Sequence, residues 1–403
     1  MDNIEKPSGF VRDVGKYVMI PAYARQRHVV VEERLKKLQA FSEETDLQKV
    51  EFGDDEIGII TSGISYQYTK EILPNASILK LGMTYPLPEG LIRDFASKVK
   101  ELYVVEELDP YLEDHIKAMG IKVKGLNKRL GELSPDILAE FFFNRKVSNI
   151  LPDIQLPFRP PVMCPGCSHR GVFYILKKKK LIVTGDIGCY TLGVIPPLEI
   201  MDTCICMGAS IGSAMGIEKA TKRSDNVVAV IGDSTFVHSG ITGLVDMVYN
   251  KSKGTVIILD NETTAMTGRQ DHPATGRTLM GEETTRLNLF ELAKTLGVEY
   301  VRYVDPYDLN ELDSVIEEAI NLDKLAVIIT NRPCTLIRRE VTSKSAEVDQ
   351  ELCVGCSLCL RIGCPAMSRA SSKDKKVKID PILCNGCMIC AQVCRNKAII
   401  EKG

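Results

Sequence analysis

The chain has 403 residues, of which 44% are hydrophobic and 26% are charged, and its formal net charge is −2. This length predicts two to four domains, and the near-neutral charge argues against a nucleic-acid-binding protein, which usually has a clear basic excess. The sequence contains no run of about 18 apolar residues and starts without an apolar leader region, so we expect a cytoplasmic protein that does not contact a membrane. In such a protein, 14 cysteines indicate metal or redox chemistry rather than disulfides.

The first 50 residues are predicted to be a linker followed by one helix. The expected helix spans residues 28–41, because Val30, Leu35 and Leu38 fall on one side of it and charged residues fall on the other. Nothing in this segment indicates a binding or catalytic site.

Residues 51–150 are predicted to form a small α/β domain. The expected strands are residues 57–61, 77–81 and 102–105, and the expected helix is residues 65–72. A proline-rich stretch at residues 149–162 predicts the boundary to the next domain.

Residues 151–340 are predicted to form a larger domain with a doubly wound parallel sheet, because strands and helices alternate along it. The expected strands are residues 181–183, 227–231, 255–259, 300–304 and 325–330, and the expected helices include 206–220 and 290–296. Several glycines punctuate the 206–220 helix, so we expect it to pack tightly against its neighbours. Cys204 and Cys206 are assigned to the packing of this helix.

Polar side chains follow two of these strands at the point where each strand ends. Gly232 and Asp233 come after the 227–231 strand, and Asn261 comes shortly after the 255–259 strand. The segment between the strands is long enough for a crossover helix, so the strands are expected to be parallel neighbours whose carboxyl ends meet at a ligand-binding edge. The carboxylate of Asp233, the amide oxygen of Asn261 and a loop carbonyl would leave positions on an octahedral Mg²⁺ for diphosphate oxygens.

The backbone around this motif is also suited to a phosphate group. Gly232 lets the chain approach a phosphate closely, and a helix expected to open near Ser239 would add the positive end of its dipole. The alternative is an ordinary βαβ unit with a polar strand end, because short motifs also occur without the function.

The spacing of these residues resembles the signature of thiamine diphosphate enzymes, which is usually Gly-Asp-Gly followed about thirty residues later by Asn. Ser234 stands here in place of the second glycine of that motif. The longer segments GDSTFVHSGITGL and LDNETTAMTGRQDHP resemble the alpha subunit of indolepyruvate:ferredoxin oxidoreductase, and the resemblance covers essentially the whole chain.

This resemblance implies that Asp233, Asn261 and the carbonyl oxygen of Thr263 hold Mg²⁺ beside thiamine diphosphate. The cofactor-binding residues that it implies are Gly188, Gly208, Gly232, Asp233, Ser234, Asn261 and Thr263. It also implies that the 51–150 segment is a transketolase C-terminal-like domain with a mainly structural role.

The reaction implied by the resemblance is the oxidative decarboxylation of an arylpyruvate such as indolepyruvate. Coenzyme A would take the acyl group, and an external ferredoxin would take the electrons. Two alternatives remain open at this point: the same chemistry on another 2-oxoacid such as pyruvate, or a non-catalytic electron-transfer or scaffold chain.

The resemblance also predicts that this chain needs partners. Members of the family work with a beta-type subunit, and their alpha subunits carry a pyrimidine-binding domain ahead of the region where this chain starts. That domain would supply the glutamate that activates thiamine diphosphate, and no glutamate of residues 1–403 can be given this role. We therefore expect another polypeptide to supply it and the chain alone to be inactive.

Three histidines, His169, His238 and His272, fall in expected loops of the 151–340 domain. A single histidine is usually structural, but three of them at motif loops indicate proton transfer near a substrate. His238 follows soon after Asp233 and is the best candidate for a catalytic residue.

Residues 341–403 are predicted to form a separate cysteine module of the bacterial two-cluster ferredoxin type. Its two runs each have three cysteines at x2 spacing and a fourth further on, and in such proteins the fourth ligand comes from the other run. One predicted [4Fe–4S] cluster has the ligands Cys353, Cys356, Cys359 and Cys394; the other has Cys384, Cys387, Cys390 and Cys364. The alternative is a pair of zinc sites, since CxxC pairs also bind Zn²⁺.

Two features of the module depart from the usual pattern. Four residues instead of three precede Cys364, and Arg395 stands where proline usually follows the second run. Residues 345–403 carry nine Lys/Arg and six Asp/Glu, and two oxidised clusters would each add about −2. The loaded module would be near neutral, so we expect it to stay attached to the chain instead of acting as a free carrier.

Four cysteines upstream form a second candidate quartet: Cys164, Cys167, Cys189 and Cys334. They lie at expected strand ends and loops, and could meet at one edge of the sheet. Related 2-oxoacid:ferredoxin oxidoreductases hold a cluster near thiamine diphosphate with cysteines in this order, which implies a third cluster here. The alternatives are a CxxC zinc or redox site and ordinary buried thiols.

Overall fold

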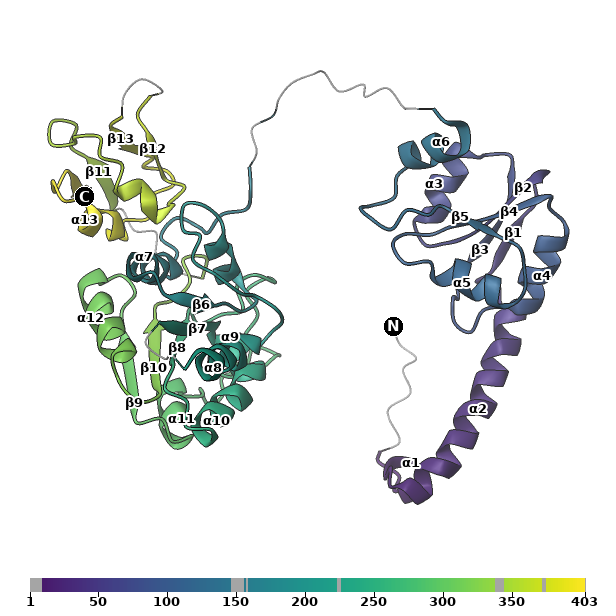
Figure 1. Cartoon of the computed structure of the whole chain (residues 1–403), viewed down its shortest axis with the longest axis horizontal. Helices are drawn as coiled ribbons and strands as arrows, with labels where there is room; N and C mark the ends of the chain where they lie inside the picture. Colours follow the sequence, from purple (N-terminus) through teal and green to yellow (C-terminus); the bar gives the residue numbers. More distant parts are fainter. Residues whose placement is uncertain are drawn as a thin grey trace. The chain divides into compact units, whose positions relative to one another are not determined.

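The computed structural model of the chain describes residues 9–145, 156, 159–222, 226–337, 344–371 and 375–402. They belong to two compact units, Met1–Leu156 and Pro157–Gly403, and each unit contains a mainly parallel sheet with helices (Figure 1). The boundaries predicted at 150/151 and at 340/341 lie outside the described residues. Among the helices of the described residues, none has both the length and the apolar character that a membrane span requires.

The first unit has a five-stranded sheet in the order β1-β3-β2-β4-β5. Its strands are β1 (Lys49–Glu51), β2 (Asp54–Ser62), β3 (Ala76–Leu81), β4 (Glu101–Val105) and β5 (Lys124–Gly125). Only the pairing of β1 with β3 is antiparallel. The expected strands are therefore present, and β1 adds a strand across the boundary that the sequence placed between residues 50 and 51.

Helices cover both faces of this sheet. They are α3 (Ser65–Ile72), α4 (Glu89–Ser97), α5 (Tyr111–Ala118) and α6 (Pro135–Phe143). From residue 9 on, two helices precede the sheet, α1 (Val14–Tyr17) and α2 (Pro21–Glu44). α2 is longer than the predicted 28–41 helix because Pro21, at its first position, is well suited to begin a helix. Near its other end, Glu43 accepts hydrogen bonds at 2.8 Å from the backbone N–H groups of Gly90 and Leu91, which ties α2 to α4.

The second unit is built on a parallel sheet in the order β6-β7-β8-β10-β9. Its strands are β6 (Ile182–Thr184), β7 (Val227–Gly232), β8 (Thr255–Asp260), β9 (Tyr300–Val304) and β10 (Ala326–Asn331). The central strands are completely buried, as expected for uninterrupted apolar runs in a sheet that is covered on both sides. The predicted parallel α/β sheet is confirmed.

Alternate residues of the central strands belong to two different cores. Val228 and Val230 pack with α7 (His169–Lys179) and α12 (Leu309–Ile320) on one face, whereas Ala229 and Ile231 pack on the other. The helices of that second face are α8 (Ala209–Thr221), α10 (Ile241–Tyr249) and α11 (Leu289–Thr295). This arrangement on both sides of the sheet, visible in Figure 1, makes the fold doubly wound.

The chain becomes helical immediately after β7. The short helix α9 (Asp233–Thr235) leads through a π-helical turn (Phe236–Gly240) into α10. The helix start expected near Ser239 is therefore wrong, because Asp233 is itself the first helical residue. Since the free N–H groups of a helix lie in its first turn, the positive end of the dipole falls at Asp233.

The C-terminal cysteine-rich segment packs onto the same unit. It contains β11 (Ser345–Val348) paired with β14 (Ile399–Lys402), β12 (Met367–Arg369) paired with β13 (Val377–Ile379), and α13 (Ile389–Val393). Its buried side chains, among them Ile362 and Val393, belong to the same apolar core as Phe173 of α7. The segment is therefore attached to the large sheet through a shared core.

The glycines of α8 differ in what they contribute to packing. Gly208, just before the helix, has a φ of +87°, and a Cβ there would lie 2.6 Å from the Ser239 hydroxyl oxygen and 2.8 Å from its carbonyl oxygen. A Cβ at Gly212 or Gly216 would meet nothing within 4 Å. The tight packing predicted for this helix is thus found at Gly208 and not at the two glycines inside α8.

This difference predicts opposite effects of two glycine substitutions. Gly208→Ala should lower the free energy of unfolding by more than about 1 kcal/mol, because it forces a left-handed residue and a steric contact. Gly212→Ala should raise it by about 0.5–1 kcal/mol, because alanine favours a helix interior. Urea denaturation of both variants measures the difference, and equal effects would contradict this account of α8.

Candidate functional site

Asp233 and Asn261 lie side by side at the carboxyl ends of β7 and β8. The Asp233 carboxylate is buried and accepts hydrogen bonds through Oδ2 from the backbone N–H groups of Asn261 (3.1 Å) and Glu262 (2.8 Å). Its Oδ1 accepts one from the N–H of Ser234 at 2.7 Å. The carboxylate is thus held in one orientation by the loops that follow both strands.

A cavity of about 100 Å³ lies against this pair of residues. Six of the seven predicted cofactor-binding residues line it: Gly188, Gly232, Asp233, Ser234, Asn261 and Thr263. A carboxylate, an amide oxygen and a nearby carbonyl form a donor set of the kind that Mg²⁺ prefers, so the residues fit this ion and a diphosphate group. The cavity is smaller than the pockets that usually enclose a whole cofactor, which fits binding of the diphosphate end alone.

Tyr190 forms part of the wall of this cavity and explains two of the glycines. A Cβ at Gly188 or Gly232 would lie 2.4 or 2.6 Å from the ring atom Cε1 of Tyr190. The ring is held in place because its hydroxyl donates to the carbonyl of Ile187 at 2.8 Å. These glycines are therefore required by the close approach of an aromatic ring, in addition to any contact with phosphate.

Gly208, the seventh predicted cofactor-binding residue, does not line this cavity. Its N–H donates to Oδ1 of Asp186 at 2.9 Å, and the N–H of Ser210 donates to Oδ2 of the same carboxylate at 3.0 Å. Asp186 is completely buried, and these two hydrogen bonds hold its carboxylate at the N-terminus of α8. The structure thus shows a role for Gly208 in the turn before α8, and its contact with a cofactor stays a prediction.

The histidines at the site are not the one that the sequence favoured. His238 is exposed on the π-helical turn and does not line the cavity. Nε2 of the buried His169 lies 3.5 Å from Nδ2 of Asn261, and Nε2 of His272 lies 3.3 Å from Oδ2 of Asp233. Burial lowers the pKa of His169 to about 4, so its imidazole is neutral near pH 7.

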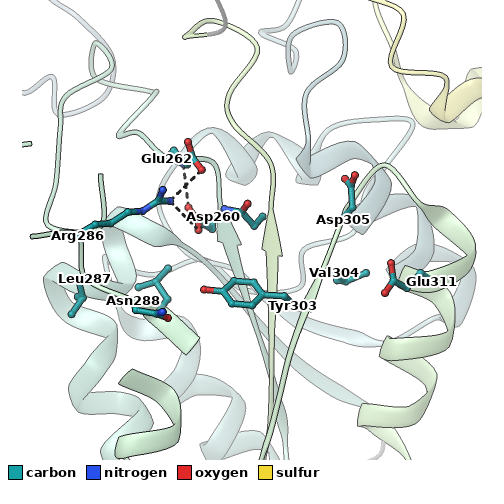
Figure 2. Close-up of a pocket in the computed structure, with 11 residues that line it drawn as sticks. Asp260, Glu262, Arg286, Leu287, Asn288, Tyr303, Val304, Asp305 and Glu311 are labelled. Atoms are coloured by element: carbon teal, nitrogen blue, oxygen red, sulfur yellow. Dashed lines mark hydrogen bonds and ion pairs between the residues drawn. The ribbon is translucent and has the colours of Figure 1, made fainter. Parts of the chain in front are cut away.

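A larger open pocket of about 710 Å³ lies on the other side of the β8 end. In Figure 2, Arg286 reaches toward Glu262 and Asp260 across this pocket, and its Nη2 lies 3.2 Å from the Glu262 carboxylate and 4.0 Å from that of Asp260. The buried Asp260 accepts a hydrogen bond of 2.7 Å from the side-chain amide of Asn331. Sequence reasoning missed this pocket, because its lining comes from segments that are far apart in the chain.

Two cavities in the C-terminal segment are each lined by one of the predicted ligand quartets. Cys353, Cys356, Cys359 and Cys394 line one; Cys364, Cys384, Cys387 and Cys390 line the other. Burial raises the pKa of Cys359 to about 11, and the nearby thiols Cys394, Cys356 and Cys353 add to the shift. The structure thus brings each fourth cysteine to the other run, and four converging thiols form a donor set that fits an iron–sulfur cluster.

The upstream cysteines also come together. Burial raises the pKa of the Cys189 thiol, and nearby Cys334 and Cys164 add to the shift. Burial likewise raises the pKa of Cys167 to about 12, with contributions from the same two thiols. The N–H of Cys334 donates to the carbonyl of Asn261 at 2.9 Å, so this quartet lies directly beside the Asp233–Asn261 edge.

Cys204 and Cys206 are exposed, so their predicted role in helix packing is wrong. Both precede the first residue of α8 and lie in the loop that leads to it. Within the described ranges, no three side chains of His, Cys, Asp or Glu are grouped closely enough to hold a single metal ion.

Comparison with known proteins supports the same region as a cofactor site. Residues 186–330 match the family described as thiamine pyrophosphate enzyme, C-terminal TPP binding domain. Indolepyruvate oxidoreductase subunit IorA of Archaeoglobus fulgidus is 37% identical over 86% of this chain and 65% of its own length. The same subunit of Pyrococcus horikoshii is 36% identical over 96% of this chain and 67% of its own length. The chain thus spans slightly less than two thirds of the first of these relatives.

One solved structure with partial similarity is 2-oxoglutarate:ferredoxin oxidoreductase from Magnetococcus marinus. It has 20% identity and a TM-score of 0.39, and the match covers 48% of this chain and 71% of that chain.

The buried Asp260 predicts a pH dependence of folding. Burial, together with the neighbouring Asp233, raises the pKa of Asp260 to about 6, above the ordinary value of about 3.9. Between these values the unfolded chain has released a proton that the folded chain keeps, so the free energy of unfolding falls as the pH rises through this window. Thermal denaturation of the cofactor-free chain across this pH window should show a smaller fall in the free energy of unfolding for Asp260→Asn than for the unaltered chain.

Asp305→Asn is the matched control, because Asp305 lines the same pocket but is half-exposed and pairs with Arg332 at 3.0 Å. It should keep the fall in the free energy of unfolding that the unaltered chain shows, because it leaves the buried Asp260 in place. An identical pH profile for Asp260→Asn and the unaltered chain would contradict the prediction.

Proposed function

Because the chain belongs to the family of indolepyruvate oxidoreductase subunit IorA, we propose that it is the cofactor-binding and electron-carrying subunit of a 2-oxoacid:ferredoxin oxidoreductase. The observation that carries the proposal is the direct contact between two sites of different chemistry. The Asp233–Asn261 edge, suited to Mg²⁺ and diphosphate, is joined by the Cys334–Asn261 hydrogen bond to a quartet of thiols suited to a cluster.

Asp233, Asn261 and the carbonyl of Thr263 would hold Mg²⁺, and the start of α9 would face the diphosphate. Thiamine diphosphate, when bound, would supply the chemistry that releases CO₂ from a 2-oxoacid. The chain itself binds and orients the diphosphate end, and the buried Tyr190 ring excludes water from that part of the cavity. The neutral His169 has a ring nitrogen at the edge of the site, where it could accept a proton.

Three quartets of thiols would carry the electrons outward as [4Fe–4S] clusters. The quartet containing Cys164 lies beside the cofactor edge, and the quartet containing Cys364 lines the cavity that Pro165 and Arg170 also line. The quartet containing Cys353 comes next. Burial is the main cause of the raised pKa of Cys390, and Cys359 of the Cys353 quartet lies close enough to Cys390 to add to it. This order would form a chain from the cofactor to the outer surface of the C-terminal segment.

We extend the proposal to an arylpyruvate such as indolepyruvate as the substrate, with coenzyme A as acyl acceptor and ferredoxin as electron acceptor. A beta-type subunit and a polypeptide with the pyrimidine-binding domain are the proposed partners, in the cytoplasm. Support for this part comes from the name of the relatives and from the small size of the cofactor cavity, which would leave the rest of the cofactor for another domain to cover.

Binding of Mg²⁺–thiamine diphosphate tests the role of Asp233. Asp233→Asn should lower the affinity at least tenfold, because the amide removes the anionic ligand of the metal. The measurement is calorimetric titration of the chain together with its partner polypeptides. Asp246→Asn, which changes an exposed carboxylate on α10, should bind as the unaltered chain does. Equal affinities of all three proteins would show that Asp233 does not hold the metal.

Cluster reduction tests the reaction. The chain is purified anaerobically and mixed with Mg²⁺–thiamine diphosphate, coenzyme A and indolepyruvate, with and without the beta-type subunit and the pyrimidine-domain polypeptide. We expect the visible absorbance of the clusters to bleach only in the complete mixture. Bleaching with pyruvate but not with indolepyruvate would show that pyruvate, and not an arylpyruvate, is the substrate. The absence of bleaching of an iron-loaded chain with any 2-oxoacid would refute the catalytic function.

A further inference from the structure

We propose that Arg170 is a positioning residue that ties the C-terminal segment to the loop containing Cys164 and Cys167. It also provides one shared positive charge for the two quartets on either side of it, the one containing Cys164 and the one containing Cys364. The inference rests on the proposed function, because it requires that these quartets hold anionic clusters.

Arg170 joins two remote parts of the chain through its guanidinium group. The side chain is buried in the first turn of α7, where Nη2 donates to the carbonyl of Met163 and Nε to that of Cys164 at 3.1 Å. On the other side, Nη1 donates to the carbonyls of Ile362 at 3.1 Å and Gly363 at 2.5 Å. The loop before Cys167 and the loop before Cys364 are therefore held by the same planar group.

The charge of Arg170 has no carboxylate counter-ion within the part of the chain that the structure describes. Its hydrogen-bond partners there are carbonyl oxygens, and cysteines of both quartets lie close enough to interact with its charge: Cys164, Cys167, Cys364 and Cys387. Arginine stays protonated in proteins, and a buried charge without an opposite charge is strongly unfavourable. Two anionic clusters, one on each side, would remove this cost.

Arginine is also the residue type that this position requires. The guanidinium offers five N–H donors in a fixed plane, so it can reach carbonyl groups of two loops at once. Lysine would keep the charge but could not make the same set of hydrogen bonds. The position therefore combines a mechanical role, which lysine would lose, with an electrostatic role, which lysine would keep.

Other contacts hold the C-terminal segment in place independently of Arg170. Gln392 accepts a hydrogen bond of 2.9 Å from the N–H of Leu309 and donates one of 2.7 Å to the carbonyl of Tyr307. The Tyr307 hydroxyl in turn donates to the carbonyl of Gly166. Together with the shared apolar core, these contacts should allow variants of Arg170 to fold.

A nearby buried cation favours the more negative, reduced state of a cluster, and this effect is strong where water is excluded. Arg170 lines the cavity of the Cys364 quartet and bonds to the loop of the Cys164 quartet, but it does not line the cavity of the Cys353 quartet. The third quartet therefore serves as an internal reference. Arg170→Gln should lower the reduction potentials of two clusters and leave the third unchanged.

The experiment is a potentiometric titration of the anaerobically purified, iron-loaded chain with dithionite, followed by electron paramagnetic resonance. For Arg170→Gln we expect the reduction equilibrium of two clusters to change at least tenfold, which is about 59 mV for one electron. The Cys356→Ala variant identifies the signal of the reference cluster. Arg361→Gln is the matched control, because it removes an exposed cation from the same loop and should change no potential.

Arg170→Lys separates the two roles and carries the test if Arg170→Gln does not fold. It should lower the thermal stability but keep the two potentials close to those of the unaltered chain. Three results would each overturn the inference and leave the proposed function intact. They are unchanged reduction potentials in a loaded Arg170→Gln chain, equal shifts of all three clusters, and potentials in Arg170→Lys that fall as far as those in Arg170→Gln. An unaltered chain that binds no clusters would overturn both.

Discussion

The parallel pairing of β7 with β8 is the constraint on which the rest of the site depends. Because Gly232 lies opposite Leu259 in this register, the residues that follow both strands meet at one edge of the sheet. The loop after β8 then donates two backbone N–H groups to the Asp233 carboxylate, which fixes the only charged member of the predicted magnesium ligands. A slip of one residue between the strands would break this match and turn the side chains to opposite faces.

The same edge extends the site toward the sulfur-rich part of the molecule. The carbonyl of Asn261 accepts a hydrogen bond from the N–H of Cys334, a member of the upstream quartet. Arg170 then bonds to the loop of this quartet at Cys164 and to the loop before Cys364 at Ile362. Because the C-terminal segment shares an apolar core with α7, the distances between the quartets are set by close packing. The proposed electron transfer between these quartets would require this kind of rigidity, which a carrier on a flexible tether would lack.

Several parts of the site could be predicted because each depends on residues close together in the chain. The Gly232–Asp233 turn, Asn261 and the two cysteine runs are local patterns, and the structure places them as their spacing suggests. The helix start expected near Ser239 is wrong, because the chain is already helical from Asp233. A π-helical turn sets the direction in which His238 points, and the sequence carries no clear signal for such a turn.

The sequence by itself determined the parallel sheet, the order of its apolar strands and the polar residues at two strand ends. It also determined that each run of x2-spaced cysteines meets a fourth cysteine from the other run. These features follow from covalent spacing and from the burial of uninterrupted apolar runs. Only the tertiary structure decided that His169 and His272, and not His238, lie beside Asn261 and Asp233. It also decided that the N–H of Gly208 bonds to Asp186 and that Arg170 bonds to loops of two quartets. These outcomes depend on which remote segments pack together, and packing is a property of the whole core that no local pattern contains.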